Sequence, residues 1–305
     1  MFPQVDCSGS PQLGAGVNVL QKFVLRLLLA GTLALSSSAS ADQGTCRGTS
    51  RVVEVDTANG PKIGKFQYPG TLDLGLREVV LTFDDGPDPV LTPKVLDILD
   101  AYCVKATFFL VGKAAEAHPD LTLEIVRRGH TLGNHSWSHP RSLRRMPSAK
   151  GRLEIEQGFN AIYTASAGAL APFFRYPGLS ESRSLNKFLQ DRQFAIFSSD
   201  VNTDDWRKHI KAETIIKGTF QRLQQRGKGI LLFHDDRPVL VEALPTILEG
   251  LKLRGYKVAH VVPKGPRLEP WASDRSVAQA PVDKPSVYSG SKATPVAHST
   301  PDALP

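Results

Sequence analysis

Residues 78–87 read EVVLTFDDGP, an apolar run that leads directly into two carboxylates and a turn sequence. The run from Glu78 to Phe83 is typical of a short buried strand, and Asp-Gly-Pro is good turn chemistry. A turn needs only one aspartate, so the other must be solvated, paired or bound to a ligand. Neighbouring side chains at a strand end diverge, so Asp84 and Asp85 can have different roles.

On both sides of this stretch, short apolar runs alternate with segments of helical spacing. We predict further strands at residues 106–111, 131–134, 173–176, 194–198, 230–233 and 256–262. Helices are predicted at residues 92–102, 121–128, 149–165, 184–191, 212–226 and 239–254. Repeated strand–helix units indicate an α/β fold with a parallel sheet. A distorted parallel (β/α) barrel of about seven strands fits this length, and a doubly wound open sheet is the competing fold.

The first 41 residues have the pattern of a secretory signal peptide. Two basic residues precede the apolar run Leu27–Leu35, and an A-x-A cleavage sequence ends at Ala41. This run is far shorter than the roughly 20 residues that span a bilayer, and an uncleaved anchor or a buried helix is the alternative. The stretch before the basic residues is almost uncharged, so we expect the start to be misassigned and the true start to lie near Val17 or Val19. We expect a periplasmic or secreted protein.

Behind the signal peptide the chain divides into three parts. Residues 42–73 form a lead-in with a short strand at 51–55, residues 74–262 carry the alternating pattern, and residues 263–305 form a Pro/Ser/Ala-rich tail. Eight of the 22 prolines lie in this tail, where no apolar period follows Trp271. The tail is therefore predicted to be disordered.

The composition excludes several classes of protein. With 22% charged and 41% hydrophobic residues, the chain is neither a polytopic membrane protein nor wholly disordered. Three cysteines are too few for a disulfide-dense miniprotein. Removal of the signal peptide leaves Cys46 and Cys103, as a disulfide or as two separate thiols. The net charge of +7 is too diffuse to indicate nucleic-acid binding.

Residues 135–139 read HSWSH, with two histidines at positions i and i+4. On a helical turn this spacing puts both imidazoles on one face, where they can reach one cation. Together with Asp85, His135 and His139 make a two-histidine, one-carboxylate site that suits zinc, cobalt or iron. The sequence therefore predicts a metal site beside the strand that ends in the two aspartates.

Other polar groups also follow predicted strands, at the face where catalytic groups gather in a parallel barrel. Arg175 ends an aromatic strand, where it either braces a carboxylate such as Asp84 or forms a structural ion pair. Asp205, beside Trp206, can orient a histidine and help to wall a small pocket, or it belongs to an acidic surface loop. His234 ends an apolar strand and is a candidate general acid, the alternative being a hydrogen-bonded core residue.

In this order the motifs resemble the five signature motifs of the polysaccharide deacetylases. They are TFDDGP (82–87), HSWSH (135–139), FRYPG (174–178), DDW (204–206) and LFH (232–234). The family is carbohydrate esterase family four, also called the nodulation-protein-B homology domain, and the resemblance covers residues 74–262. It implies a distorted barrel of about seven strands and one divalent metal ion held by Asp85, His135 and His139.

The resemblance also implies roles for the remaining side chains. Asp84 would be the general base with Arg175 as its brace, and His234 would be the general acid, tuned by Asp205. Substrate contacts would come from Tyr176, whose neighbourhood offers a backbone N–H to the oxyanion, and from Trp206 and Leu232, which would line the acetyl-methyl pocket. Two positions depart from the family pattern, since Gly178 follows Pro177 directly and Asn202 replaces a common aspartate.

The function that follows is hydrolysis of N-acetyl groups on a glycan that contains N-acetylglucosamine, with release of acetate. Zinc best suits the ligand set, and cobalt or nickel would also fit. The alternatives are hydrolysis of another amide or an O-acetyl ester, and a non-catalytic glycan-binding module. We expect an acetylated glycan as partner, no nucleic acid, and no stable membrane insertion after the signal peptide is cleaved. The sequence leaves open the oligomeric state and the polymer, whether chitin oligomer, peptidoglycan or exopolysaccharide.

Overall fold

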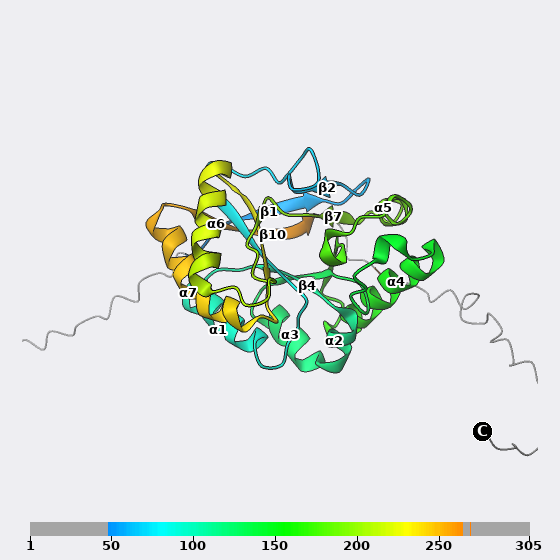
Figure 1. Cartoon of the computed structure of the whole chain (residues 1–305). Helices are drawn as coiled ribbons and strands as arrows, with labels where there is room; N and C mark the ends of the chain where they lie inside the picture. Colours follow the sequence, from blue (N-terminus) through cyan, green and yellow to red (C-terminus); the bar gives the residue numbers. More distant parts are fainter. Residues whose placement is uncertain (1–47, 265–268, 270–305) are drawn as a thin grey trace, which may run out of the picture. The chain divides into compact units, whose positions relative to one another are not determined.

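The computed structural model of the chain describes residues 48–264 and 269. The chain divides into two units, Met1–Thr45 and Cys46–Pro305, and every described residue belongs to the second (Figure 1). The predicted signal peptide lies outside the described residues, as does the predicted tail apart from residues 263, 264 and 269. Residues 263 and 264 complete the last strand.

Strands and helices alternate along most of the described chain. The strands are β1 (Thr49–Asp56), β2 (Lys62–Ile63), β3 (Glu78–Asp84), β4 (Thr107–Leu110), β5 (Thr131–Asn134), β6 (Leu170–Arg175), β7 (Ala195–Phe197), β8 (Val201–Asn202), β9 (Gly229–His234) and β10 (Lys257–Lys264). The helices are α1 (Thr92–Ala101), α2 (Gly112–Ala117), α3 (Pro119–Arg127), α4 (Ser148–Ala165), α5 (Arg183–Gln190), α6 (Ala212–Arg226) and α7 (Pro238–Leu253), with short 3-10 turns η1 (Leu143–Arg145) and η2 (Pro177–Leu179). Among these described helices, none has both the length and the apolar character that a membrane span requires.

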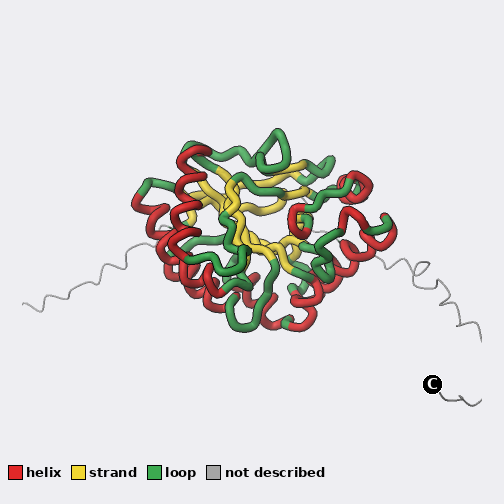
Figure 2. The backbone as a smooth tube through the Cα atoms, in the orientation of Figure 1, coloured by secondary structure: helices red, strands yellow, loops and turns green. Residues whose placement is uncertain are grey.

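Seven parallel strands follow one another around a barrel that does not close. β3 pairs with β4, and the pairing continues through β5 and β6 to β7. On its other side β3 pairs with β9, and β9 pairs with β8. In the described part of the chain β7 and β8 do not pair, so the barrel has a seam there. Figure 2 shows the helices on the outer side of the strands.

This strand order confirms the predicted barrel-like α/β fold. A doubly wound sheet would reverse its strand order at a switch point, whereas β3 to β7 are neighbours in chain order. The seven strands are nevertheless not the seven expected from the sequence. The two-residue β8 is too short to show a pattern, and the predicted last strand, β10, pairs with β1 along its length but with β3 only at Glu78 and Val79.

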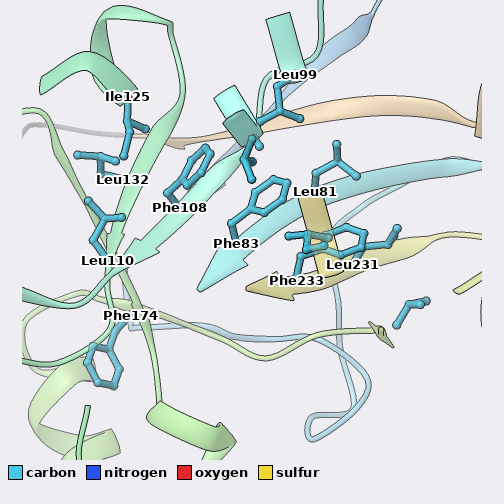
Figure 3. Close-up of a cluster of buried hydrophobic side chains, with 14 of the residues drawn as sticks. Leu81, Phe83, Leu99, Phe108, Leu110, Ile125, Leu132, Phe174, Leu231 and Phe233 are labelled. Atoms are coloured by element: carbon cyan, nitrogen blue, oxygen red, sulfur yellow. The ribbon is translucent and has the colours of Figure 1, made fainter. Parts of the chain in front are cut away.

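Successive side chains of each strand point alternately to its two faces, and the buried apolar side chains therefore form two layers, one under the helices and one inside the barrel. The outward side chains of β3, Leu81 and Phe83, pack with Phe108 and Phe233 beneath the helices (Figure 3). The ring centroids of Phe83 lie 5.0 Å from Phe108 and 5.5 Å from Phe233. The period of two therefore turns Val80, Thr82 and Asp84 into the barrel. The polar end of β3 is thus placed inside the ring.

The predicted lead-in contributes side chains to the barrel interior. Val53 and Val55 of β1 and Leu72 beyond β2 are buried with Val80. Because β1 and β10 join the sheet at the first residues of β3, these side chains fill the interior near the strand beginnings. Polar groups are left at the opposite ends of the strands.

Cys103 is disulfide-bonded, and the two other cysteines of the chain lie outside the described residues. The backbone N–H of Thr49 donates to the carbonyl oxygen of Cys103 at 3.0 Å, and a Cβ on Gly48 would collide with that same carbonyl. The chain just after Cys46 therefore lies against Cys103. Of the two states that the sequence left open, a disulfide and two separate thiols, the disulfide-bonded state of Cys103 agrees with the first.

His130 is a buried histidine that the fold keeps neutral. Its Nδ1 accepts a hydrogen bond from the N–H of Ala106 at 3.1 Å, and its Nε2 has no hydrogen-bond partner within the described residues. Burial, helped by the nearby Lys105 and His260, lowers the pKa of His130 to about 3. The unfolded chain binds this proton with a pKa of about 6.5, so stability is lost as the pH falls below that value.

We expect His130→Asn to reduce the loss of stability on acidification. The asparagine oxygen can still accept from Ala106, but it takes up no proton in the unfolded chain. Between about pH 7 and pH 5 the wild type should lose roughly 1–2 kcal/mol through His130 alone, a loss that the variant avoids. Urea unfolding at both pH values measures this change in the free energy of unfolding, with His118→Asn as a control. Equal acid sensitivity in wild type and His130→Asn would contradict the interpretation.

Candidate active site and metal centre

Parallel strands bring the candidate residues to one end of the barrel. Asp84, Arg175 and His234 are the last residues of β3, β6 and β9. His135 directly follows β5, and Asp205 follows β8 by three residues. Because the carboxyl ends of parallel strands lie at the same edge, residues far apart in the sequence meet there.

Asp85, His135 and His139 form a cluster able to hold a metal ion. Their ligand atoms all lie within 4.8 Å of one another. The Oδ1 atom of Asp85 is 3.5 Å from Nε2 of His135 and 3.1 Å from Nε2 of His139. This oxygen is buried and accepts no hydrogen bond among the described residues. A buried carboxylate oxygen facing two imidazole nitrogens is the arrangement expected of a metal site.

The protonation states of the cluster also suit a cation. Nδ1 of His135 lies 2.8 Å from the carbonyl oxygen of Arg175, which makes it the N–H donor and leaves Nε2 as the ligand atom. Burial and the neighbouring His135 lower the pKa of His139, which favours its neutral, ligating form. Although burial opposes ionisation, His135 and the other nearby histidines hold the pKa of Asp85 well below its usual range. The three residues therefore fit a divalent metal ion with one carboxylate and two imidazole ligands.

The HSWSH segment reaches the cluster as a bent loop, so the predicted helical turn is wrong. Ser136 and His139 have φ angles of 70° and 53°, in the left-handed region that non-glycine residues rarely adopt. The first N–H groups of α2 donate to the carbonyl oxygens of Ser136 and Trp137, both at 2.9 Å. The carboxylate of Glu154 on α4 accepts from the N–H and hydroxyl of Ser138. Contacts with α2 and α4 thus override the local helical spacing.

Asp84 and Arg175 form a buried ion pair, the contact that the sequence suggested. Nη1 of Arg175 donates to Oδ1 of Asp84 at 2.7 Å and to Oγ1 of Thr82 at 2.9 Å. Nη2 of the same guanidinium donates to the carbonyl oxygen of Ser198 at 2.9 Å. The guanidinium also lies over the ring of Phe109, 4.2 Å from its centroid. The second oxygen of Asp84 faces the cluster, 3.8 Å from Nε2 of His135.

His234 is held by both oxygens of Asp205. Nδ1 of His234 lies 2.8 Å from Oδ1 of Asp205, and its backbone N–H donates to Oδ2 at 2.7 Å. The hydroxyl of Thr203 also donates to Oδ1 of Asp205. Burial disfavours the imidazolium, but the hydrogen bond and charge of Asp205 outweigh it and raise the pKa of His234 to about 9. His234 is therefore protonated at neutral pH, as a proton donor must be.

The three residues predicted to contact substrate lie in different surroundings. Leu232 is 3% exposed and lies two residues before the end of β9. Trp206 is 51% exposed, with Arg207 over its ring. The side chain of Tyr176 is buried, and its hydroxyl donates to Oδ1 of Asn186 at 2.9 Å. Tyr176 thus directs its ring towards α5 and can offer the site only its backbone.

Sequence reasoning missed three residues that shape the site. Thr82 faces the barrel interior with Asp84, which the period of two could have indicated. Asp235, fully buried, accepts hydrogen bonds from the N–H of Gly86 and the hydroxyl of Thr92, and so fixes the loop after Asp85. Arg237 brings Nη2 to 3.7 Å from Oδ2 of Asp85. No spacing rule links these last two residues to the first motif.

The chain is similar in sequence to several known proteins. A family model described as polysaccharide deacetylase matches residues 73–196. A peptidoglycan-N-acetylglucosamine deacetylase of Bacillus cereus is 34% identical over 200 residues, which cover 64% of this chain and 70% of that protein. A chitooligosaccharide deacetylase of Bradyrhizobium sp. is 30% identical over 62% of this chain and 91% of its own length.

A solved structure extends the similarity to the fold. A peptidoglycan deacetylase of Bdellovibrio bacteriovorus superimposes with a TM-score of 0.65 at 29% sequence identity. The match covers 72% of this chain and 60% of that one. The similarity in fold therefore extends over most of the part of the chain that the structure describes.

Proposed function

Since the chain belongs to the polysaccharide deacetylase family of hydrolases, we propose that it removes acetyl groups from a glycan containing N-acetylglucosamine and releases acetate. The observation that carries this proposal is the cluster of Asp85, His135 and His139 beside the paired carboxylate of Asp84. The names of the relatives support the substrate class, since they act on N-acetylglucosamine in peptidoglycan or on chitooligosaccharides.

One divalent metal ion is part of the proposal, with zinc the first choice and cobalt or nickel also suited. Bound at the cluster, it would supply a Lewis acid that polarises the acetyl carbonyl and acidifies the attacking water. The carbonyl oxygen of Arg175 keeps the tautomer of His135 ready for such an ion. Asp235 accepts a hydrogen bond from the N–H of Gly86 and so fixes the position of the neighbouring Asp85.

Asp84 is proposed as the general base. Its Oδ1 is engaged by Arg175, so its second oxygen is the one that takes a proton from the attacking water. The water oxygen forms the new bond to the acetyl carbon, and a backbone N–H near Tyr176 helps to stabilise the oxyanion. Leu232 and Trp206 are proposed to line the space for the acetyl methyl group.

His234 is proposed as the general acid. As the bond between the acetyl carbon and nitrogen breaks, Nε2 of His234 gives its proton to the departing amine, because Nδ1 is held by Asp205. The products are acetate and a free amino sugar. The raised pKa of His234 supports this role, since the residue then starts the reaction protonated.

Acetate release from a panel of acetylated glycans tests the proposal. Chitin oligomers, peptidoglycan and an N-acetylated exopolysaccharide are each incubated with the protein and added zinc, cobalt or nickel. We expect acetate from at least one of them and none after treatment with a chelator. Acetate only from O-acetyl esters would replace the proposed reaction with an esterase reaction. Glycan binding without any acetate would indicate a non-catalytic module.

We expect Asp205→Asn to move the alkaline limb of the pH profile downwards. In the wild type kcat/KM should fall as His234 loses its proton, near the raised pKa of about 9. Without the charge of Asp205, burial dominates and the pKa of His234 falls. The limb should therefore shift towards about 6.5 or lower, while the acidic limb stays in place. The values are read as those of the whole coupled site.

Asp204→Asn is the matched control for this experiment. It makes the same change one residue earlier, but Asp204 pairs with Arg222 and Arg207 instead of His234. Its alkaline limb should coincide with that of the wild type. An unchanged limb in Asp205→Asn, or an equal shift in both variants, would show that Asp205 does not tune His234.

We further propose that the protein acts in the periplasm or outside the cell. The signal-peptide pattern of residues 1–41 supports this location, and so does the disulfide at Cys103, since disulfides persist in oxidising compartments. N-terminal sequencing of the exported protein should find a start near Asp42. An exported protein that retains Leu27–Leu35 would indicate a membrane anchor instead.

A further inference from the structure

Outside the candidate active site, a hollow of about 610 Å³ lies between α2, α3 and α4. The three helices pack against one another on the outer side of the barrel (Figure 1). The indole of Trp137 lines the hollow, and none of the lining residues is a proposed metal ligand, base or acid. The first requirement of a second binding site, a concave surface with an aromatic side chain, is therefore met.

Trp137 is held firmly at this position. Its carbonyl oxygen accepts from the N–H of Lys113, and a Cβ on Gly112 would come within 3.0 Å of its ring. Across the contact, a Cβ on Gly158 would come within 2.5 Å of the backbone of Ser136. Two glycines thus let α2 and α4 close on the loop that carries Trp137, which is half-buried and lines the hollow.

The rim of the hollow is polar and carries negative charge. Gln157, Asn160 and Thr164 of α4 contribute amides and a hydroxyl, and Glu116 and Asp120 contribute exposed carboxylates. Among the described residues that line the hollow there is no lysine or arginine, although the chain as a whole carries a net charge of +7. An anionic ligand would therefore be repelled. A cationic group is favoured, because carboxylates pair with it and an indole face attracts it.

We propose that this hollow binds a protonated amino-sugar unit of a glycan. The sugar ring stacks on Trp137, its hydroxyl groups meet the amides of α4, and its ammonium group lies near Glu116 and Asp120. The source of this ligand rests on the proposed function, since deacetylation converts a neutral N-acetyl group into an amine. The hollow is thus a product site, which keeps the protein on glycan that has already been partly deacetylated.

The position of Trp137 gives the site a physical connection to the metal cluster. It stands two residues from His135 and two from His139, in a loop whose backbone both α2 and α4 hold. Residues 135–139 thus contribute both to the hollow, through Trp137, and to the cluster, through His135 and His139. Substitutions on the rim leave this loop untouched and can test binding separately from the reaction.

Titration with a glucosamine tetramer tests the proposal. The indole N–H signal of Trp137, assigned with Trp137→Phe, is followed by NMR in the full chain. We expect it to shift with the glucosamine tetramer and to shift much less with the N-acetylglucosamine tetramer. The rim variant Glu116→Gln/Asp120→Asn should weaken binding of the glucosamine tetramer by about tenfold or more. Its acetate release from a soluble N-acetylated oligomer should equal that of the wild type.

Glu213→Gln/Glu242→Gln is the control, because it removes the same charge from exposed positions on α6 and α7. It should bind the glucosamine tetramer as the wild type does. The proposal is overturned if the Trp137 signal does not move, if both tetramers bind equally, or if the rim variant keeps wild-type affinity. Failure of the proposed deacetylation would show instead as missing acetate, which this binding measurement does not depend on.

Discussion

His139→Ala is expected to abolish metal binding and lower kcat by about 10³-fold or more, because the variant loses one of the three proposed ligands and with it the proposed Lewis acid. His139 is the better position to change than His135. Its side chain is 30% exposed, whereas that of His135 is 1% exposed and bonded to the carbonyl oxygen of Arg175. Removal of His139 therefore leaves no large cavity, and the fold should survive.

Elemental analysis after dialysis measures the metal content, acetate release measures kcat, and circular dichroism shows whether the fold survives. His118→Ala is the control, since it removes a histidine from outside the cluster. It should retain full metal content and activity. If the His139→Ala protein holds as much metal as the wild type, then Asp85, His135 and His139 are not the ligand set.

Arg175→Met is expected to cost about 3–5 kcal/mol of unfolding free energy, because it leaves the carboxylate of Asp84 buried without its partner. The guanidinium is 0% exposed and the carboxylate 3% exposed, so solvent cannot replace the lost contact. The hydroxyl of Thr82 and the carbonyl oxygen of Ser198 also lose a donor. For a domain of this size the Tm should fall by roughly 10 °C.

A double-mutant cycle separates the ion pair from the packing of the side chain. In the Asp84→Asn background, Arg175→Met should cost at least about 1 kcal/mol less than in the wild type, because no charge is then left unpaired. Urea unfolding is measured with chelator present, since a bound ion would add stability of its own. Equal costs in both backgrounds would mean that the pair contributes nothing beyond packing.

The ends of several elements could be read from the sequence because local signals mark them. Gly227, with a φ of 74°, ends α6 where the pattern predicted, and the range predicted for β5 is the observed one. α2 and β8, with six and two residues, are too short to carry a period. The pairing of β10 with β1 depends on contacts between distant segments, which no local pattern contains.

The candidate site was predictable to the extent that strand ends converge. The sequence could therefore bring Asp84, Arg175 and His234 together, since each ends a strand of one parallel sheet. The loop of His139 was wrongly expected to be helical, because the packing of α2 and α4 decides its conformation. The directions of Tyr176 and of other aromatic side chains likewise depend on which helix lies beside them.

Arg175 touches two different parts of the candidate site at once. Its guanidinium holds Asp84, and its carbonyl oxygen receives the N–H of His135. Small thermal displacements of β6 therefore carry the proposed base and a proposed ligand in the same direction. We therefore expect the separation between these two groups to vary less than the position of either one. The shared support from Arg175 would keep the geometry of the proposed proton removal constant in a barrel that does not close between β7 and β8.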